Sequence, residues 1–223
     1  MINLRISKRL QAIASFVDDS DEKVYDVGCD HALLDIYLAS KYKNSIFNAI
    51  DISEKCIENA RISIKKSGFE KRIVAKVNNG LKDFDIEENS TLVISGMGTH
   101  TIIEILNDCD VVNLKKIIIQ SNNDLELLRR HMVKLGFVIK KEISVYDKKH
   151  YVIIEFIQGI SEYSDDEYFF GPYLMQNSNK NKLYFSYLLM KYEKIYKKIP
   201  IFNLKKKISM FLNIKKLKRL LKK

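Results

Sequence analysis

Hydrophobic and polar residues follow a repeating pattern over the first 157 residues, and this pattern predicts strands and helices in turn. Short apolar runs, typical of buried strands, are separated by stretches with apolar residues three or four positions apart, typical of amphipathic helices. The strands are expected at residues 23–27, 45–50, 72–77, 91–95 and 114–120, and the helices at residues 3–17, 32–42, 53–67, 99–107 and 124–135. Repeated strand–helix units predict an α/β fold, with a parallel sheet covered by helices on both faces.

The pattern changes after residue 136. Two strand-like segments, residues 137–146 and 150–157, are joined by the polar residues 147–149, which predicts a β-hairpin. We expect this hairpin to add one antiparallel strand to the parallel sheet. Such an arrangement is typical of the Rossmann-like sheet of class I methyltransferases and not of ordinary dinucleotide-binding folds.

The last part of the chain has a helical pattern. After an expected linker, residues 158–166, an aromatic-rich helix is predicted at 177–198 and a basic helix at 204–223, with Pro200 between them. These two helices predict an antiparallel helical hairpin. The expected apolar stripe of the second helix comprises Ile208, Phe211, Leu212, Leu217 and Leu220. The chain is thus predicted to divide into residues 1–160, which bind the cofactor, and a basic helical domain, residues 161–223.

Composition excludes several classes of protein. Apolar residues make up 46% of the 223 residues, which is typical of a globular chain. No apolar run is long enough to span a membrane, and residues 1–10 lack the apolar segment of a signal peptide. The three cysteines and four histidines show no spacing typical of a disulfide framework or a metal site. We therefore expect a cytoplasmic protein without a metal ion.

Basic residues are concentrated at the C-terminal end. Residues 176–223 hold 15 Lys or Arg and one acid, whereas the preceding residues hold 23 basic and 27 acidic side chains. A genome-wide bias towards lysine would raise Lys everywhere, and it would not remove acids from one segment. The segment is therefore expected to bind a polyanion, with nucleic acid favoured over an anionic membrane.

The loop after the first expected strand carries two acids and one glycine. Gly28 allows the backbone to approach a ligand, and ligands bind at the carboxyl ends of parallel strands. Asp26 and Asp30 would repel a pyrophosphate and attract the α-amino group of a methionine moiety. The loop therefore favours S-adenosylmethionine over NAD or FAD as the ligand. His31, the residue after Asp30, is expected to bind the same cofactor. The alternative is that the acids only cap the next helix.

Polar residues also follow the second and third expected strands. Asp51, followed by Ile52, is placed to bind both ribose hydroxyls of the cofactor. Asn79 and Gly80 follow the third strand, where they would meet the adenine. Taken singly, Asp51 is explained equally well as the residue before a helix cap, and Asn79 as part of a polar turn.

The fourth and fifth expected strands lead to candidate catalytic segments. Gly96, Met97 and Gly98 allow close backbone approach where an acceptor base would meet the sulfonium methyl group. Gly96 and Met97 are also expected to bind the cofactor. His100 is either a base or tRNA contact, or a solvent-exposed residue of the next helix. Asn122 follows the fifth strand and is expected to add an amide to the pocket wall.

Together these residues resemble one family, the bacterial tRNA (adenine-22-N1)-methyltransferases known as TrmK. The matching elements occur in order across nearly the whole chain, at residues 7–10 (SKRL), 26–32 (DVGCDHA), 96–98 (GMG), 120–122 (QSN) and 170–172 (FGP). The resemblance implies a Rossmann-like catalytic domain followed by a helical, coiled-coil-like domain. It also implies S-adenosylmethionine as the cofactor and N1 of adenine 22 in tRNA as the methyl acceptor.

The chain departs from the family pattern at two positions. Thr99 stands where the family usually has a further glycine, and Ser121 stands where it usually has proline. We expect Thr99 to add a side chain at the pocket rim and Ser121 to loosen the loop that carries Asn122. Neither change removes a functional group, so an active enzyme is expected.

Methylation of adenine N1 requires an exposed base edge, aligned reactants and stabilisation of a cationic product. Asp30 is the candidate catalytic carboxylate, with His31 and Asn122 as orienting or proton-handling groups; alternatively, Asp30 binds the amino group of the cofactor. The basic helices are expected to grip tRNA phosphates. Their tyrosines either stack on bases or pack the helical hairpin.

Three alternatives remain open. The first is a methyltransferase that acts on another RNA, on a protein or on a small molecule. The second is a non-catalytic RNA-binding protein with a methyltransferase-like fold. The third is a protein in which residues 204–223 lie on an anionic membrane as an amphipathic helix. We expect a monomer without stable membrane association.

Overall fold

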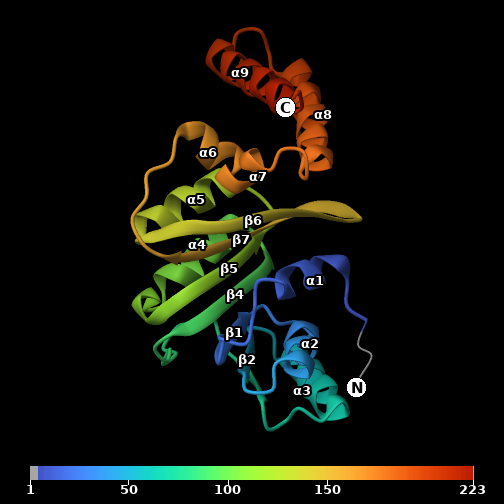
Figure 1. Ribbon diagram of the computed structural model, residues 1–223, viewed down its shortest axis with the longest axis vertical. Helices are drawn as coiled ribbons and strands as arrows, with labels where there is room; N and C mark the ends of the chain where they lie inside the picture. The colour runs from blue at the N-terminus through green and yellow to red at the C-terminus, as the bar shows by residue number, and fades with distance from the viewer. Residues whose placement is uncertain (1–4, 223) are drawn as a thin grey trace.

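A computed structural model describes residues 5–222, and within them seven strands form one twisted sheet (Figure 1). The strands are β1 (Lys23–Val27), β2 (Ile46–Asp51), β3 (Ile73–Val77), β4 (Ser90–Met97), β5 (Leu114–Ser121), β6 (Phe137–Asp147) and β7 (Lys149–Gln158). Their order is β3-β2-β1-β4-β5-β7-β6, and only β7 runs against the others. The Rossmann-like methyltransferase sheet with a terminal hairpin is therefore confirmed.

Helices cover both faces of the sheet, and each face has its own apolar core. One face is covered by α1 (Lys8–Ala14), α2 (Leu33–Lys41) and α3 (Glu54–Ser67), and the other by α4 (Thr99–Asn107) and α5 (Leu125–Lys134). A 3-10 turn, η1 (Val111–Asn113), precedes β5. The helix expected at residues 3–17 is shorter than predicted: residues 3–4 lie outside the described residues, and α1 begins at Lys8, after its cap Ser7, and ends at Ala14. Phe16 and Val17 are buried directly after the helix.

The end of β4 differs from the expectation. Gly96 and Met97 were predicted in a loop, but they are the last residues of β4, and Met97 pairs with Ser121 of β5 across an irregularity in the register. Gly96 has a φ of 83°, a conformation that glycine adopts without strain. The two central strands therefore extend to the edge where the site is expected.

Two short helices, which the sequence pattern did not predict, stand at the end of the expected linker and directly after it. These are α6 (Asp165–Phe170) and α7 (Pro172–Gln176), and they pack on α5 and β6 (Figure 1). A capping box at Ser164 and Glu167 starts α6, and Pro172 occupies the first turn of α7.

A buried ion pair fixes these two helices to the sheet. Arg129 of α5 and Glu142 of β6 are both fully buried, and Arg129 Nε donates to Glu142 Oε1 at 2.8 Å. Arg129 Nη1 also donates to the Tyr168 carbonyl at 2.8 Å, and the Tyr173 amide donates to Glu142 Oε2 at 3.1 Å. A Cβ atom at Gly171 would lie 2.6 Å from Glu142 Oε2. The Phe-Gly-Pro motif is therefore the point where the C-terminal helices dock.

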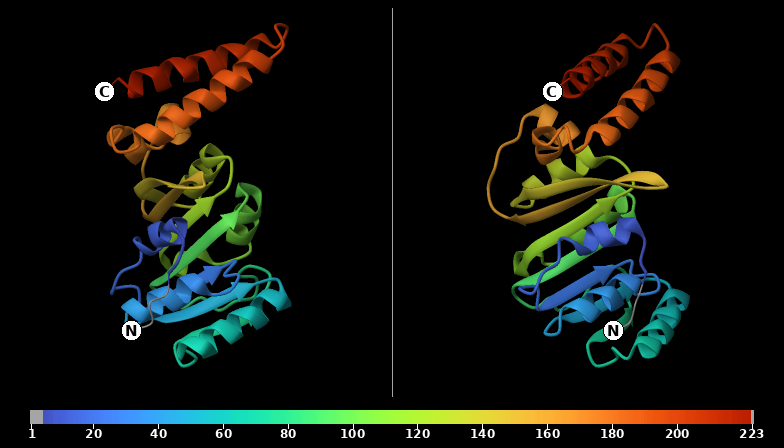
Figure 2. Two further views of the ribbon diagram at one scale, coloured as in Figure 1. Left: turned by 90° about the vertical axis from the view of Figure 1, so that its right-hand side faces the viewer. Right: turned by 45° about the vertical axis from the view of Figure 1, so that its right-hand side comes forward.

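The last two helices, α8 (Lys182–Lys198) and α9 (Leu204–Leu220), form the predicted antiparallel hairpin, which projects from the body (Figure 2). Only the second half of α9 is packed, through Ile214, Leu217 and Leu220. The predicted stripe is wrong in the first half, where Ile208, Phe211 and Leu212 are about half exposed. Ile208 and Leu212 line a hollow between α9 and residues of α5 and α6. No helix within residues 5–222 has the length and apolar character needed to cross a membrane.

Candidate methyltransferase site

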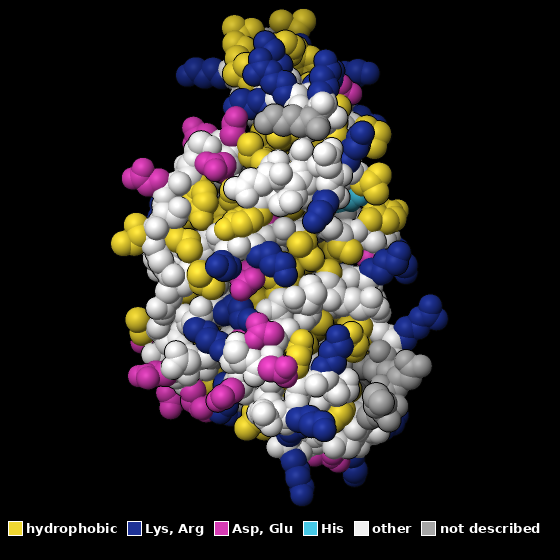
Figure 3. Space-filling model, viewed as in Figure 1, with side chains coloured by type: hydrophobic (Ala, Val, Ile, Leu, Met, Phe, Trp, Pro, Cys, Tyr) yellow, Lys and Arg dark blue, Asp and Glu magenta, His cyan; other side chains and the backbone are white. Residues whose placement is uncertain are grey.

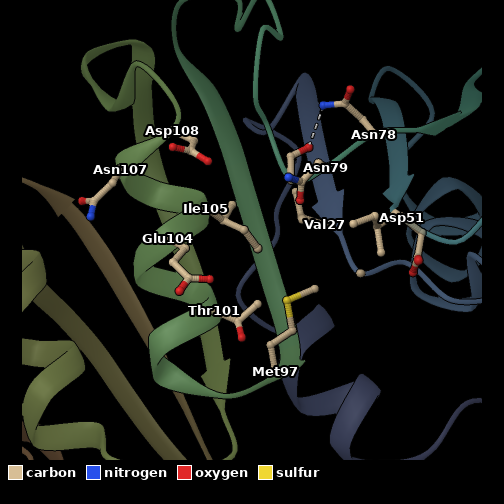
Figure 4. A pocket seen from close by; sticks show the side chains of 13 residues that line it. Val27, Asp51, Asn78, Asn79, Met97, Thr101, Glu104, Ile105, Asn107 and Asp108 are labelled. Carbon is tan, nitrogen blue, oxygen red and sulfur yellow. Dashed lines mark hydrogen bonds between the residues drawn. The ribbon is translucent and has the colours of Figure 1, made fainter.

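A cleft of about 390 Å³ opens where the parallel strands end (Figure 4). Six residues predicted to bind the cofactor line it, from the ends of four strands: Gly28, Asp51, Ile52, Asn79, Gly80 and Met97. The opposite wall is formed by α4, a helix for which the sequence pattern indicated no cofactor contact. It contributes Thr101, Glu104, Ile105, Asn107 and Asp108.

Two glycines make the cleft possible. Gly28 has a φ of 82°, and a Cβ atom there would lie 2.4 Å from Met97 Cε. Gly80 has a φ of 60°, and a Cβ atom there would lie 2.9 Å from Ile105 Cγ1. Real Cβ contacts are not this short, so a side chain at either position would displace another residue that lines the cleft.

Loop hydrogen bonds hold the polar groups of the cleft in place. Asp51 accepts from the Ser53 amide through Oδ1 at 2.9 Å and from the Asp30 amide through Oδ2 at 3.4 Å. Asn78 Nδ2 donates to the Gly80 carbonyl at 3.0 Å, as the dashed line in Figure 4 shows. Asn78 lies beside the predicted Asn79 and shapes the same turn, a role that sequence reasoning missed.

A smaller hollow of about 60 Å³ adjoins the cleft, and Gly28 lines both. It brings together Arg9 and the three predicted residues Asp26, Asp30 and His31. Asp26 is buried, and its Oδ1 has no hydrogen-bond partner among the residues that the structure describes. Burial raises the pKa of Asp26 to about 7, against the opposing effects of a hydrogen bond with Asp35 and the charge of Arg9.

Asp35 is a buried acid beside Asp26 that sequence reasoning missed. It lies on α2, fully buried, and desolvation together with the charge of Asp26 raises its pKa well above the usual range. Two buried carboxyls in contact cannot both be ionised at low cost, so the pair retains a proton near neutral pH. An acid among Leu34, Ile36 and Leu38 is the signal that could have identified it.

Asp30 and His31 lie at the mouth of this hollow. Asp30 adopts a φ of 52°, and its carboxylate Oδ1 lies 3.4 Å from His31 Nε2. The Asp30 side chain is 70% exposed and that of His31 is 47% exposed. They are therefore accessible to a substrate that approaches from solvent, whereas Asp26 is accessible only from within the cleft and its adjoining hollow.

A chain of hydrogen bonds orients Asn122. Arg9 Nη1 donates to Gln120 Oε1 at 2.8 Å, and Gln120 Nε2 donates to Asn122 Oδ1 at 3.1 Å. Asn122 Nδ2 in turn donates to the Gly96 carbonyl at 2.7 Å. Gly96, predicted to bind the cofactor, does not line the 390 Å³ cleft, and its carbonyl holds Asn122 instead. The matching SKRL element contained Arg9, but nothing in the sequence indicated its role.

The two departures from the family pattern lie elsewhere than expected. Thr99 is fully buried, so it adds nothing to the pocket rim, and the expectation was wrong. Its Oγ1 lies 2.8 Å from Ser121 Oγ and donates to the Asn123 carbonyl at 2.6 Å. Ser121 is thereby held and does not loosen the loop before Asn122.

His100 is exposed on α4 and does not line the described cleft.

The donor set fits an S-adenosyl amino acid. Asp26 offers a buried carboxyl oxygen without a partner among the described residues, which suits an ammonium group, and Asp51 offers carboxylate oxygens to a diol. Asn79 offers an amide to a heterocycle edge. A dinucleotide would place a pyrophosphate beside Asp26 and Asp30, where like charges repel it.

Comparisons with known proteins identify the family of the chain. The sequence profile of a methyltransferase domain matches residues 6–154. A tRNA (adenine(22)-N(1))-methyltransferase of Bacillus subtilis is 28% identical over 145 residues, which span 64% of this chain and 60% of that relative, less than two thirds of its length.

Two solved structures match over nearly the whole chain. A protein of the NADB-Rossmann superfamily from Streptococcus agalactiae has a TM-score of 0.89 and 28% identity, with 99% of each chain covered. TrmK of M. capricolum, described in complex with S-adenosylhomocysteine, has a TM-score of 0.83 and 31% identity, with 97% of this chain and 98% of that chain covered. The family predicted from the sequence is thus confirmed, and this chain belongs to the TrmK family of methyltransferases.

Proposed function

We propose that this chain transfers the methyl group of S-adenosylmethionine to N1 of adenine 22 in tRNA. The observation that carries the proposal is the continuity of the cleft, through Gly28, with the hollow that contains Asp26 and Asp30. The prediction of the cofactor is confirmed by relatives described in complex with S-adenosylhomocysteine and S-adenosylmethionine. The B. subtilis relative named for adenine 22 supports the acceptor.

The chain's own residues divide the work of binding. Asp26 holds the amino group of the cofactor, Asp51 its ribose hydroxyls, and Asn79 its adenine. When bound, the cofactor supplies an electrophilic methyl group on a sulfonium sulfur. Gly28 and Gly80 leave room for it, and α4 shields it from water. A bound ammonium group favours the ionised form of Asp26, because opposite charges in a buried site attract strongly.

The acceptor side is formed by Asp30, His31 and Asn122. We assign Asp30 as the carboxylate that stabilises the cationic methylated base and takes a proton from its exocyclic amine. His31 Nε2, 3.4 Å from Asp30 Oδ1, holds that carboxylate at the mouth of the hollow. The Asn122 amide, fixed by Gln120 and Gly96, orients the edge of the base.

The basic helical hairpin supplies the main electrostatic contact with tRNA in this proposal. Lys and Arg side chains gather over α8 and α9 (Figure 3). Lys218 pairs with Glu193 at 2.9 Å, and Lys216 pairs with Asp166. Lys205 and Lys206 are exposed at the start of α9, where they are available to phosphates. We also propose that the two domains meet between residues 160 and 161, that the protein is a monomer and that it is located in the cytoplasm.

The test is incubation with labelled S-adenosylmethionine and total tRNA, followed by mapping of the methylated nucleotide. We expect N1-methyladenine at position 22, and no product from a tRNA with guanine at that position. Label in a different RNA, or at another nucleotide, would favour the alternative of a methyltransferase with another RNA substrate. Absence of any transfer, with cofactor binding intact, would favour a non-catalytic RNA-binding protein.

Asp30→Ala separates the two roles of that residue. If Asp30 acts on the base, kcat falls strongly while calorimetry gives an unchanged Kd for S-adenosylhomocysteine. If Asp30 binds the cofactor, that Kd rises as well. Near-normal turnover of the variant would remove Asp30 from the site.

A further inference from the structure

A second hollow, of about 610 Å³, lies outside the cofactor cleft, between the tip of the β6–β7 hairpin and α8. We call it the hairpin hollow. Six of its lining residues define it here: Asn122, Tyr146, Lys148, Lys149, His150 and Tyr187. It is larger than the cleft, and of these six residues only Asn122 has a role in the site described above.

Aromatic rings form one wall of the hairpin hollow. The rings of His150 and Tyr187 are stacked, with centroids 4.7 Å apart and planes 23° apart, and the Tyr146 ring lies 5.0 Å from His150 at 57°. Tyr146 is 57% exposed and Tyr187 37% exposed. Burial lowers the pKa of His150, so its ring is uncharged at neutral pH. Uncharged rings with an open side are the surface on which nucleobases stack.

Two ammonium groups lie beside the rings. Lys148 and Lys149 form the turn of the hairpin, and both are exposed. Asp147, the acid next to them, accepts a hydrogen bond from the Arg9 amide at 3.1 Å, which ties the turn to α1. Cations next to an aromatic wall match a nucleotide, which carries a phosphate next to a base.

The hairpin hollow and the cofactor cleft meet at the ends of β4 and β5. The backbone N–H of Asn122 donates to the Met97 carbonyl at 2.8 Å, and its side-chain Nδ2 donates to the Gly96 carbonyl. Met97 lines the cofactor cleft and Asn122 lines the hairpin hollow. The two cavities therefore adjoin at these strand ends, and a base in the hairpin hollow lies next to the cofactor cleft.

We propose that the hairpin hollow receives the target nucleotide of the RNA, with its purine base stacked on His150 and Tyr187 and its phosphates beside Lys148 and Lys149. This inference rests on the proposed function, since it assigns the place of the methyl acceptor. An adenine taken out of its stack loses base stacking, and the aromatic wall replaces part of what is lost. The Asn122 amide then faces the base edge nearest the cofactor.

The first test compares variants by steady-state kinetics. We expect His150→Ala and the double variant Lys148→Glu/Lys149→Glu each to raise the KM for tRNA by about tenfold or more, given the usual strength of base stacking and phosphate contacts. Calorimetry should show an unchanged Kd for S-adenosylhomocysteine. Tyr187→Phe, which keeps the ring, should resemble the wild type. The matched control is Lys65→Glu/Lys66→Glu on α3, which should leave the KM unchanged. An unchanged KM in both hollow variants would overturn the inference.

The second test detects binding directly and does not depend on methyl transfer. The cofactor cleft is first saturated with S-adenosylhomocysteine, and adenosine 5′-monophosphate is then added. We expect an upfield shift of the His150 ring-proton resonance, assigned with His150→Gln, and no such shift with ribose 5-phosphate. Equal shifts from both would mean that the hollow binds only phosphate, and no shift would mean that it binds no nucleotide; either overturns the inference.

The two proposals fail in different ways. If the wild-type protein methylates another nucleotide while adenosine 5′-monophosphate shifts His150, the assignment of adenine 22 is wrong and the hairpin hollow still binds nucleotides. If adenine 22 is methylated and both hollow variants have a normal KM for tRNA, the hollow is not the acceptor site.

Discussion

Thr99 Oγ1 and Ser121 Oγ lie 2.8 Å apart and are hydrogen-bonded in the interior of the protein. These are the two positions at which the chain departs from the TrmK pattern, and the departures contact each other. Thr99 Oγ1 also donates to the Asn123 carbonyl, and Ser121 Oγ lies 2.9 Å from that carbonyl. The hydroxyl pair therefore joins the start of α4 to the loop that carries Asn122.

Replacing Thr99 by valine tests this relationship. The substitution keeps the shape of the side chain and removes the hydroxyl, so buried acceptors lose a donor at a cost of about 1–3 kcal/mol. We expect a lower melting temperature and a lower kcat, with an unchanged Kd for S-adenosylhomocysteine. Thr99→Ser keeps the hydroxyl and is the control. If Thr99→Val and Thr99→Ser turn over tRNA equally well, the hydroxyl pair does not position Asn122.

A second prediction concerns Gly28. In Gly28→Ala the new Cβ atom would lie 2.4 Å from Met97 Cε, so the end of the Met97 side chain, which lines the cleft, must shift. We expect the Kd for S-adenosylmethionine to rise by about tenfold or more, since the cofactor then competes with a side chain. Gly68→Ala is the matched control, because Gly68 also has a positive φ, of 70°, but has nothing within 4 Å of the added atom. It should lower stability without changing the Kd. Equal affinity in the two variants would contradict the explanation.

The buried acids predict a dependence of stability on pH. The pKa of Asp26 is raised to about 7 and that of Asp35 is also raised, so the folded protein holds a proton more tightly than the unfolded chain. This contribution is present at low pH and is lost as pH rises through about 7. Asp35→Asn removes one of the two acids and should flatten the dependence. At pH 8 the variant should be more stable than the wild type, by on the order of 1 kcal/mol or more. Urea unfolding at pH 5.5 and pH 8 measures the free energy of unfolding of both proteins. The same change between the two pH values in the variant and in the wild type would refute the prediction.

The basic hairpin predicts a dependence of tRNA affinity on salt. Replacing Lys205, Lys206 and Lys207 with glutamine should lower affinity and reduce the slope of log K against log salt concentration. The expected reduction is about 0.7–0.9 for each phosphate that a lysine no longer neutralises. The triple substitution is preferable to truncation, because Leu217 is fully buried and its removal would uncover apolar surface on the body. Lys65→Gln/Lys66→Gln on α3 provides the control. A slope equal to that of the wild type would exclude the start of α9 from the contact with tRNA.

Much of the fold follows from periodicity, because strands and helices repeat in a regular order and their apolar faces meet one shared sheet. The cofactor loops follow as well, since parallel strands deliver Gly28, Asp51 and Asn79 to the same edge. Periodicity does not reveal pairings between distant residues. The Asp26–Asp35 pair, the contact of Arg9 with Gln120 and the burial of Thr99 depend on how elements pack, and no local pattern encodes them. The partial exposure of the apolar residues at the start of α9 was not predicted for the same reason, since it depends on how closely that helix packs on the rest of the protein.

The buried pair of Arg129 and Glu142 also determines how the two parts of the chain melt. The two charges compensate each other, and the Tyr168 carbonyl and the Tyr173 amide add hydrogen bonds to them only when α6 and α7 are docked. Undocking of these helices would break these charge-assisted hydrogen bonds, each of which contributes about 1.5–3 kcal/mol. We therefore expect partly detached states to be disfavoured, and the sheet and its C-terminal arm to unfold in a single thermal transition.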